Sequence, residues 1–160
     1  MVLLRGLREK TKRVHKFGKT GKVRLGTCHI DLQLIMYTAL SVSDVDFGIA
    51  EGHRIIEKQR QYFLEGKSMI DGETVIGKHN FYPSLAVDIY AWVEGKICYD
   101  KESISYIAGL IMGVSRMLLK EGRITHKVRW GGNWDMDGTI LIDQSFDDRP
   151  HFELCSHDSD

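Results

Sequence analysis

The chain has 160 residues, of which 42% are hydrophobic and 28% are charged, as is typical of one globular domain that can bury a core without disulfides. Its 22 basic and 22 acidic residues give a net charge of zero, so net charge provides no argument for nucleic-acid binding. No apolar run approaches the roughly 18 residues of a membrane span, and the first residues lack the apolar stretch of a secretory signal. With three scattered cysteines, we expect reduced thiols and a cytosolic location without a membrane span.

The N-terminal segment differs in charge from the rest of the chain. Residues 1–25 contain nine Lys and Arg and a single acid, Glu9, whereas residues 26–160 carry a net charge of −8. We expect residues 1–25 to form a partly disordered basic segment, which is either simply solvated or holds the protein near a polyanion. Residues 26–155 would then form one domain, and residues 156–160 a short tail.

Hydrophobic spacing predicts the regular elements. Apolar residues at three-to-four spacing predict helices at residues 28–42, 54–65 and 101–121. The third has the most regular stripe and ends just before Gly122, so we expect it to be the central core helix. Short β-branched or alternating stretches predict strands at residues 85–90, 127–130 and 151–154. Without regular alternation of strands and helices, this order favours an α+β fold with an antiparallel sheet.

Asp88 stands inside the apolar segment 85–90. A buried carboxylate is costly unless it is paired or bound to a metal, although an aspartate on the solvent side of an edge strand is also common. His79 precedes Asp88 by nine residues, and the intervening Pro83 predicts a turn that would bring the two side chains together. A surface histidine is the alternative for His79.

A second histidine follows in the segment 147–154, Asp-Asp-Arg-Pro-His-Phe-Glu-Leu. The proline prevents a regular helix, His151 opens an alternating strand, and Asp148 lies three residues before it. Two imidazoles and one carboxylate form a three-ligand set that leaves zinc a fourth position for water, beside which Asp148 could act as a general base. The spacing alone is also compatible with an accidental match, because histidine and aspartate are common.

Several motifs in the same order resemble a known family. The chain is similar to the D-alanyl-D-alanine carboxypeptidase-type zinc peptidases, and in particular to the phage endolysin branch, the L-alanyl-D-glutamate peptidases. The resemblance extends from about residue 17 to 154, and these segments carry it: Asp46-Phe47, Glu51-Gly52-His53-Arg54, Gln59, Gly66-Lys67-Ser68, His79, Pro83 to Asp88, Val128 to Asp135, and Pro150 to Leu154. It implies a small single domain of the Hedgehog/DD-peptidase type, with a central antiparallel sheet packed by helices.

The resemblance also implies roles for individual residues. It assigns Zn²⁺ binding to three positions: His79, Asp88 and His151. Asp148 matches the catalytic acid, and Arg54 matches an arginine that binds and polarises the substrate. We expect Ser84 and Trp134 to contact the substrate and Trp130 to be a core residue. The eight residues between the first two ligands exceed the family's frequent six, which predicts a variant loop.

The implied function is a zinc-dependent peptidoglycan hydrolase, a phage or prophage endolysin that cuts a stem-peptide bond. The L-Ala–D-Glu bond is the first expectation. D-Ala–D-Ala carboxypeptidase or dipeptidase activity and a non-catalytic zinc-binding module that docks on the wall are the alternatives. The partner would be the bacterial stem peptide, without nucleic acid. We expect a monomer that accumulates in the host bacterial cytoplasm and acts on the wall after release.

Overall fold

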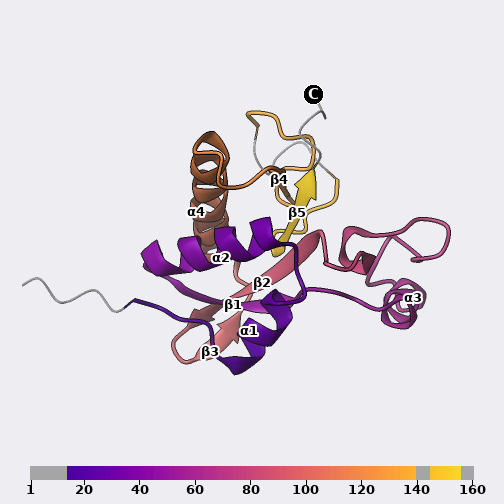
Figure 1. Cartoon of the computed structure of the whole chain (residues 1–160). Helices are drawn as coiled ribbons and strands as arrows, with labels where there is room; N and C mark the ends of the chain where they lie inside the picture. Colours follow the sequence, from indigo (N-terminus) through magenta and orange to yellow (C-terminus); the bar gives the residue numbers. More distant parts are fainter. Residues whose placement is uncertain (1–13, 140–144, 156–160) are drawn as a thin grey trace, which may run out of the picture.

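The computed structural model describes residues 14–139 and 145–155 (Figure 1). Their elements are, in chain order, α1 (Lys19–Leu25), α2 (Ile30–Val42), β1 (Asp46–Glu51), α3 (Ile56–Leu64), the 3₁₀ helix η1 (Lys78–Asn80), β2 (Ala86–Val93), β3 (Lys96–Cys98), α4 (Lys101–Lys120), β4 (Lys127–Trp130) and β5 (His151–Cys155). The strands pair antiparallel in the order β1-β2-β5-β4, and β3 pairs with β2. The predicted α+β fold with a central antiparallel sheet is confirmed.

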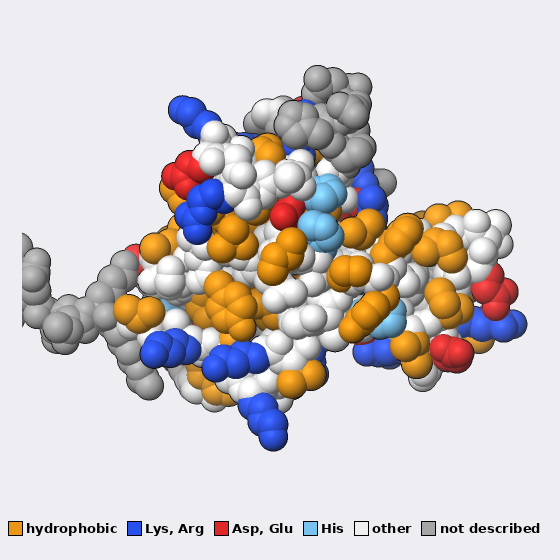
Figure 2. Space-filling view, in the orientation of Figure 1, with side chains coloured by type: hydrophobic (Ala, Val, Ile, Leu, Met, Phe, Trp, Pro, Cys, Tyr) orange, Lys and Arg blue, Asp and Glu red, His pale blue; other side chains and the backbone are white. Residues whose placement is uncertain are grey.

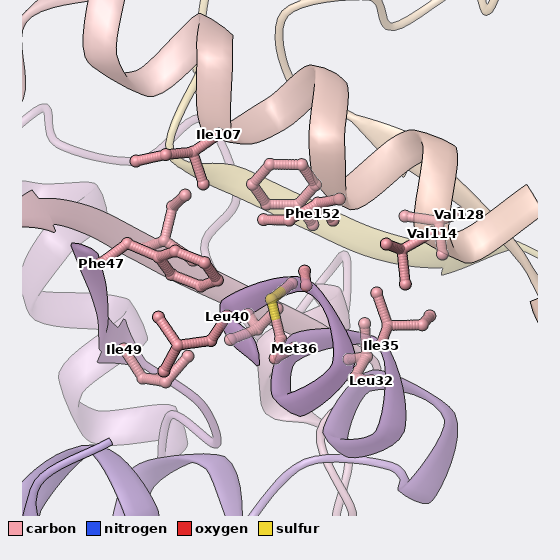
Figure 3. Packing of buried hydrophobic residues seen from close by; sticks show 14 of the residues in the cluster. Leu32, Ile35, Met36, Leu40, Phe47, Ile49, Ile107, Val114, Val128 and Phe152 are labelled. Carbon is pink, nitrogen blue, oxygen red and sulfur yellow. The ribbon is translucent and has the colours of Figure 1, made fainter. Parts of the chain in front are cut away.

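The core lies between one face of the sheet and the two long helices (Figure 3). Val87, Ile89 and Ala91 of β2 point into it, because alternate residues of a strand share a face. Phe152 of β5 joins them and is completely buried. α2 and α4 cover this face, so the opposite face of the same strands is left for polar side chains (Figure 1).

α4 is the core helix that the sequence predicts. Asp100 caps its N-terminus by accepting a hydrogen bond of 2.7 Å from the Ser103 amide. By length and composition alone, this helix of 20 residues could cross a membrane. Its apolar stripe instead lies in the core, where Ile104, Ile107 and Ile111 are at most 1% exposed.

The end of the predicted basic segment, residues 19–25, forms the helix α1. Within the described part of the predicted basic segment, α1 packs against β1, and Phe17 and Leu25 belong to the core. These two apolar side chains anchor the helix while its lysines remain exposed. Residues 1–13 and the predicted tail at 156–160 lie outside the described residues.

α3 lies apart from the other helices. Together with the segment that follows it, up to residue 77, it forms a projection beside the end of the sheet where η1 leads into β2 (Figure 1). We refer to residues 56–77 as the α3 lobe. The lobe and the polar face of the sheet together frame the site described next.

Candidate metal centre

Two predicted ligands face each other across neighbouring strands. In the β2–β5 register, Asp88 is opposite His151. The residues on either side of Asp88, Val87 and Ile89, point into the core, and so does Phe152. Strand alternation therefore directs Asp88 and His151 to the opposite, polar face of the sheet.

The third predicted ligand, His79, comes from η1. Its carbonyl accepts a hydrogen bond of 2.8 Å from the Arg54 amide, and the neighbouring Asn80 side chain donates to the Arg54 carbonyl at 2.9 Å. His79 Nδ1 lies 2.7 Å from the Gly52 carbonyl oxygen, to which it donates, so Nε2 is left to face Asp88. A Cβ at Gly52 would lie 2.4 Å from the Arg24 carbonyl oxygen, so only glycine fits there without displacing its neighbours.

The three side chains converge on one point. His79 Nε2 lies 3.1 Å from Asp88 Oδ1 and 3.3 Å from His151 Nδ1, and the same Oδ1 lies 2.9 Å from His151 Nδ1. Around one ion with bonds of about 2.0–2.1 Å, tetrahedral ligand atoms are about 3.3 Å apart. The two histidines are buried, at 5% and 8% exposure. This buried set of two nitrogens and one oxygen can hold a metal ion.

A buried carboxylate stands behind His151. Glu153, also on the polar face of β5, accepts a hydrogen bond of 3.0 Å from His151 Nε2, which leaves Nδ1 for the ion. Arg129 of β4 donates to Glu153 from Nε at 3.1 Å. Burial raises the pKa of Glu153, but the hydrogen bonds from His151 and Arg129 outweigh it and hold the pKa below its ordinary value. Glu153 and Arg129 were not predicted as site residues. The signal for Glu153 was its spacing of two residues from a ligand on the same strand.

A second carboxylate, Glu51, holds Arg54. An irregularity in the β1–β2 register between Ile49 and Glu51 places Glu51 opposite Asp88, on the polar face. Arg54 donates to Glu51 from Nε at 2.9 Å, and its Nη2 lies 3.5 Å from Asp88 Oδ2. Gln59 of α3 also accepts a hydrogen bond from this guanidinium, at 2.9 Å from Nη1. The fixed positive charge of Arg54 therefore lies directly beside the ligand set.

The charges of the cluster are strongly coupled. Burial raises the pKa of Asp88, but the charges and hydrogen bonds of His79 and His151 outweigh it and hold the pKa below its ordinary value. Burial lowers the pKa of His151, but hydrogen bonds to Asp88 and Glu153 outweigh it and raise the pKa to about 10. A cation that binds Nδ1 must displace a proton, so binding is coupled to pH.

Asp148 lies at the same pocket. Its carbonyl accepts from the His151 amide at 3.1 Å, and its amide donates to the Gly131 carbonyl at 3.0 Å, which ties the segment before β5 to the end of β4. Burial and the negative charge of Asp88 raise the pKa of Asp148 above its ordinary value. A carboxyl with a raised pKa is suited to taking up and releasing a proton near neutral pH.

A pocket of about 990 Å³ lies over these groups. Gln59, Tyr62 and Met69 line it from the α3 lobe, and Trp134 and Phe146 line it from the segment between β4 and β5. The Trp134 ring packs 5.4 Å from the His151 ring and 5.9 Å from the Phe146 ring, measured between centroids. Aromatic rings therefore flank the ligand set at His151.

Six of the seven predicted site residues line this pocket: His79, Asp88, His151, Asp148, Arg54 and Trp134. Ser84 does not line it. Its side chain is completely buried, and its Oγ donates to the Ala86 carbonyl at 2.7 Å, where the chain enters β2. Trp130 is 6% exposed and belongs to the core, as expected.

Comparisons with known proteins identify the family and the fold. The sequence profile of the family described as phage L-alanyl-D-glutamate peptidase matches residues 13–155. The L-alanyl-D-glutamate peptidase of Escherichia phage T5 is 26% identical over 124 residues, which cover 77% of this chain and 84% of that protein. The crystal structure of the Serratia marcescens L-Ala D-Glu endopeptidase ChiX has a similar fold, with a TM-score of 0.68 and 24% identity over 94% of this chain and 96% of that one. The profile match includes every residue of the pocket, and the chain therefore belongs to the phage L-alanyl-D-glutamate peptidase family.

Proposed function

We propose that the protein is a zinc-dependent peptidoglycan hydrolase that cleaves the L-Ala–D-Glu bond of the stem peptide. The observation that carries this proposal is the convergence of His79, Asp88 and His151 on one point of a pocket that also contains Asp148 and Arg54. Two imidazoles and a carboxylate suit Zn²⁺, and three protein ligands leave a position for water. Membership in the family supports the choice of bond.

The pocket residues have different roles in the proposed hydrolysis. Zn²⁺ held by the three ligands would supply a Lewis acid and water with a pKa lowered toward about 7. Asp148 accepts a proton from the attacking water and delivers it to the leaving amine, a role for which its raised pKa is suited. Arg54, fixed by Glu51 and Gln59, donates hydrogen bonds to the carbonyl oxygen as negative charge develops on it.

The rest of the pocket suits an anionic peptide. Five basic side chains line it, although Lys58 and Arg129 also pair with the pocket carboxylates Glu51 and Glu153: Arg54, Lys58, Lys67, Lys78 and Arg129. A stem peptide carries a free carboxylate next to the L-Ala–D-Glu bond, and such a group binds well to ammonium and guanidinium groups. Trp134 would provide the apolar surface against which the peptide backbone lies.

Digestion of purified cell walls tests the proposal. With Zn²⁺ present, mass spectrometry should identify D-Glu as the newly exposed amino terminus. Release of D-Ala would instead favour the carboxypeptidase alternative, and an inactive zinc-loaded protein would favour the wall-docking module. Asp148→Asn should retain zinc and lose turnover. The matched control Asp147→Asn removes an exposed charge one residue away and should remain active. Full activity of Asp148→Asn would refute the assignment of the base.

We also propose that the protein is a monomer that accumulates in the host bacterial cytoplasm and reaches the wall only after the membrane is opened. The phage peptidase relative supports this location. Fractionation of expressing cells should find the protein in the cytoplasmic fraction, and lysis from outside should require permeabilised cells. Spontaneous lysis of intact expressing cells would contradict the proposed dependence on release.

A further inference from the structure

A second group of metal-binding side chains lies outside the pocket. It consists of His29, which caps the N-terminus of α2, Asp31 in the first turn of that helix, and His126, one residue before β4. One ligand atom from each residue lies within 4.8 Å of the others. Histidine side chains gather on this face of the molecule, near the start of α2 (Figure 2). None of the three residues lines the pocket.

Asp31 is held in place by one of its two carboxylate oxygens. Oδ2 accepts hydrogen bonds from the amides of Thr125 and His126, at 2.9 and 3.2 Å, and lies 2.8 Å from His126 Nδ1. The side chain of Asp31 is only 7% exposed. Burial raises the pKa of Asp31, but the hydrogen bonds from His126 and Thr125 outweigh it and hold the pKa below its ordinary value. A charged carboxylate is therefore fixed between the two imidazoles.

The other oxygen of Asp31 lies near the His29 ring. Oδ1 lies 3.9 Å from His29 Nδ1 and takes part in no hydrogen bond within residues 14–139 and 145–155. His29 Nδ1 accepts a hydrogen bond of 3.1 Å from the Asp31 amide, so this nitrogen carries no proton. The lone pair of His29 Nδ1 is thus held by the Asp31 amide, whose place an ion would take, whereas Asp31 Oδ1 is left with no donor within the described residues, an arrangement that a cation would stabilise.

The imidazole of His126 completes the arrangement. Its ring centroid lies 4.8 Å from that of His29, at an interplanar angle of 75°. The side chains of His29 and His126 are 25% and 33% exposed, so an ion can enter from solvent and keep water in its remaining positions. Two nitrogens and one carboxylate favour Zn²⁺ and similar transition metals over Ca²⁺ and Mg²⁺, which prefer oxygen ligands.

We propose that His29, Asp31 and His126 form a second binding site for a divalent transition-metal ion such as Zn²⁺. The ion links the start of α2 to the start of β4, across 95 residues of sequence between Asp31 and His126. An ion that binds only the folded chain stabilises it by mass action. The site is therefore a structural clip that is independent of the proposed hydrolase activity.

Metal stoichiometry tests the site. The full chain is freed of metal with a chelator and dialysed against buffered Zn²⁺, and bound zinc is measured by atomic absorption. His29→Ser keeps an oxygen that can cap α2 but removes the imidazole, and His126→Gln keeps a donor for Asp31. At a free Zn²⁺ concentration that fills both sites of the wild type, each variant should bind one zinc ion fewer per chain. The control His15→Ala removes an imidazole that lies 3.5 Å from an Asp46 carboxylate oxygen and should bind as much as the wild type.

The difference in bound zinc between variant and wild type tests the second site whether or not the pocket also binds zinc. An unchanged stoichiometry in both His29→Ser and His126→Gln would overturn the proposal. Asp88→Asn, which removes a ligand of the pocket, provides a second measurement. In this variant, free Zn²⁺ at about 100 times the dissociation constant of the second site should raise the ratio of folded to unfolded protein about 100-fold. The effect should disappear in Asp88→Asn/His29→Ser, and its persistence there would also overturn the proposal.

Discussion

Replacement of Glu153 by Gln would show how strongly the carboxylate behind His151 tunes metal binding. Glu153 is 5% exposed, and its Oε2 lies 3.0 Å from His151 Nε2. A carboxylate can only accept a hydrogen bond, so it keeps the proton on Nε2 and the lone pair on Nδ1. Glutamine has nearly the same shape but no charge, and its amide can either accept from His151 or donate to it.

The contacts set the size of the expected effect. A hydrogen bond that involves a charged partner contributes about 1.5–3 kcal/mol, and each 1.4 kcal/mol corresponds to a factor of about ten in binding. This agrees with the loss of about 10–100-fold in metal affinity that is typical when such an outer partner of a ligand is removed. We therefore expect Glu153→Gln to bind Zn²⁺ about 10–100-fold more weakly, with hydrolysis restored when zinc is in excess.

The assay is a competition with a chromophoric chelator, combined with wall hydrolysis as a function of free zinc. The activity curve of Glu153→Gln should shift to higher zinc and reach a plateau close to that of the wild type. Glu121→Gln, a change at an exposed position at the end of α4, serves as the control. Unchanged zinc affinity would refute the reasoning. A plateau that excess zinc cannot restore would show that Glu153 acts on the reaction and not through His151.

Three further substitutions test the fold that supports the site. Gly52→Ala should lower the free energy of unfolding by about 1–3 kcal/mol, because its methyl group would lie 2.4 Å from the Arg24 carbonyl oxygen; unchanged stability in urea would contradict this. Asp31→Asn should destabilise the metal-free protein near neutral pH. The pKa of Asp31 in the folded protein lies below 3.8, so its carboxylate stabilises the fold above that pH and stops doing so as pH falls through the folded value. Urea titrations at several pH values should show the difference from wild type shrinking in acid, and a constant difference would refute the reasoning. Ile89→Ala, at a completely buried position, should cost about 2–5 kcal/mol, whereas the exposed Ile97→Ala should change stability by about 0.5 kcal/mol or less; similar losses would refute the placement of the core.

Elements with a repeated local pattern could be predicted from the sequence. α4 has an apolar stripe over 20 residues and a capping residue, and both signals are local. The sequence did not predict α1, β1, β3 or the short η1, and the first two lack such signals. α1 has seven residues and depends on Phe17 and Leu25 contacting a core made by distant segments. β1 contains Gly48, which is disfavoured in strands and fits here because the Tyr90 ring covers it on the neighbouring strand.

The site residues also divide into those that local sequence signals predict and those that depend on tertiary structure. The types and order of the pocket residues could be predicted from motif spacing and from resemblance. The place of Glu51 could not, because it depends on a register irregularity opposite Asp88 that only strand pairing creates. Ser84 was predicted from its place in a motif and does not belong to the pocket. Its buried hydroxyl donates to the Ala86 carbonyl instead. Position along the chain does not report the direction in which a side chain points.

The alternation along β2 and β5 restricts how this protein can diversify. Along these strands, side chains that pack in the core alternate with side chains that face the pocket. The insertion of a single residue would therefore exchange the two sets of side chains and abolish both stability and activity. Adaptation to walls of different composition is therefore confined to segments that border the pocket without belonging to the sheet. Residues 65–77 are such a segment, and grafting them between relatives should alter which walls are digested while leaving the catalytic apparatus intact.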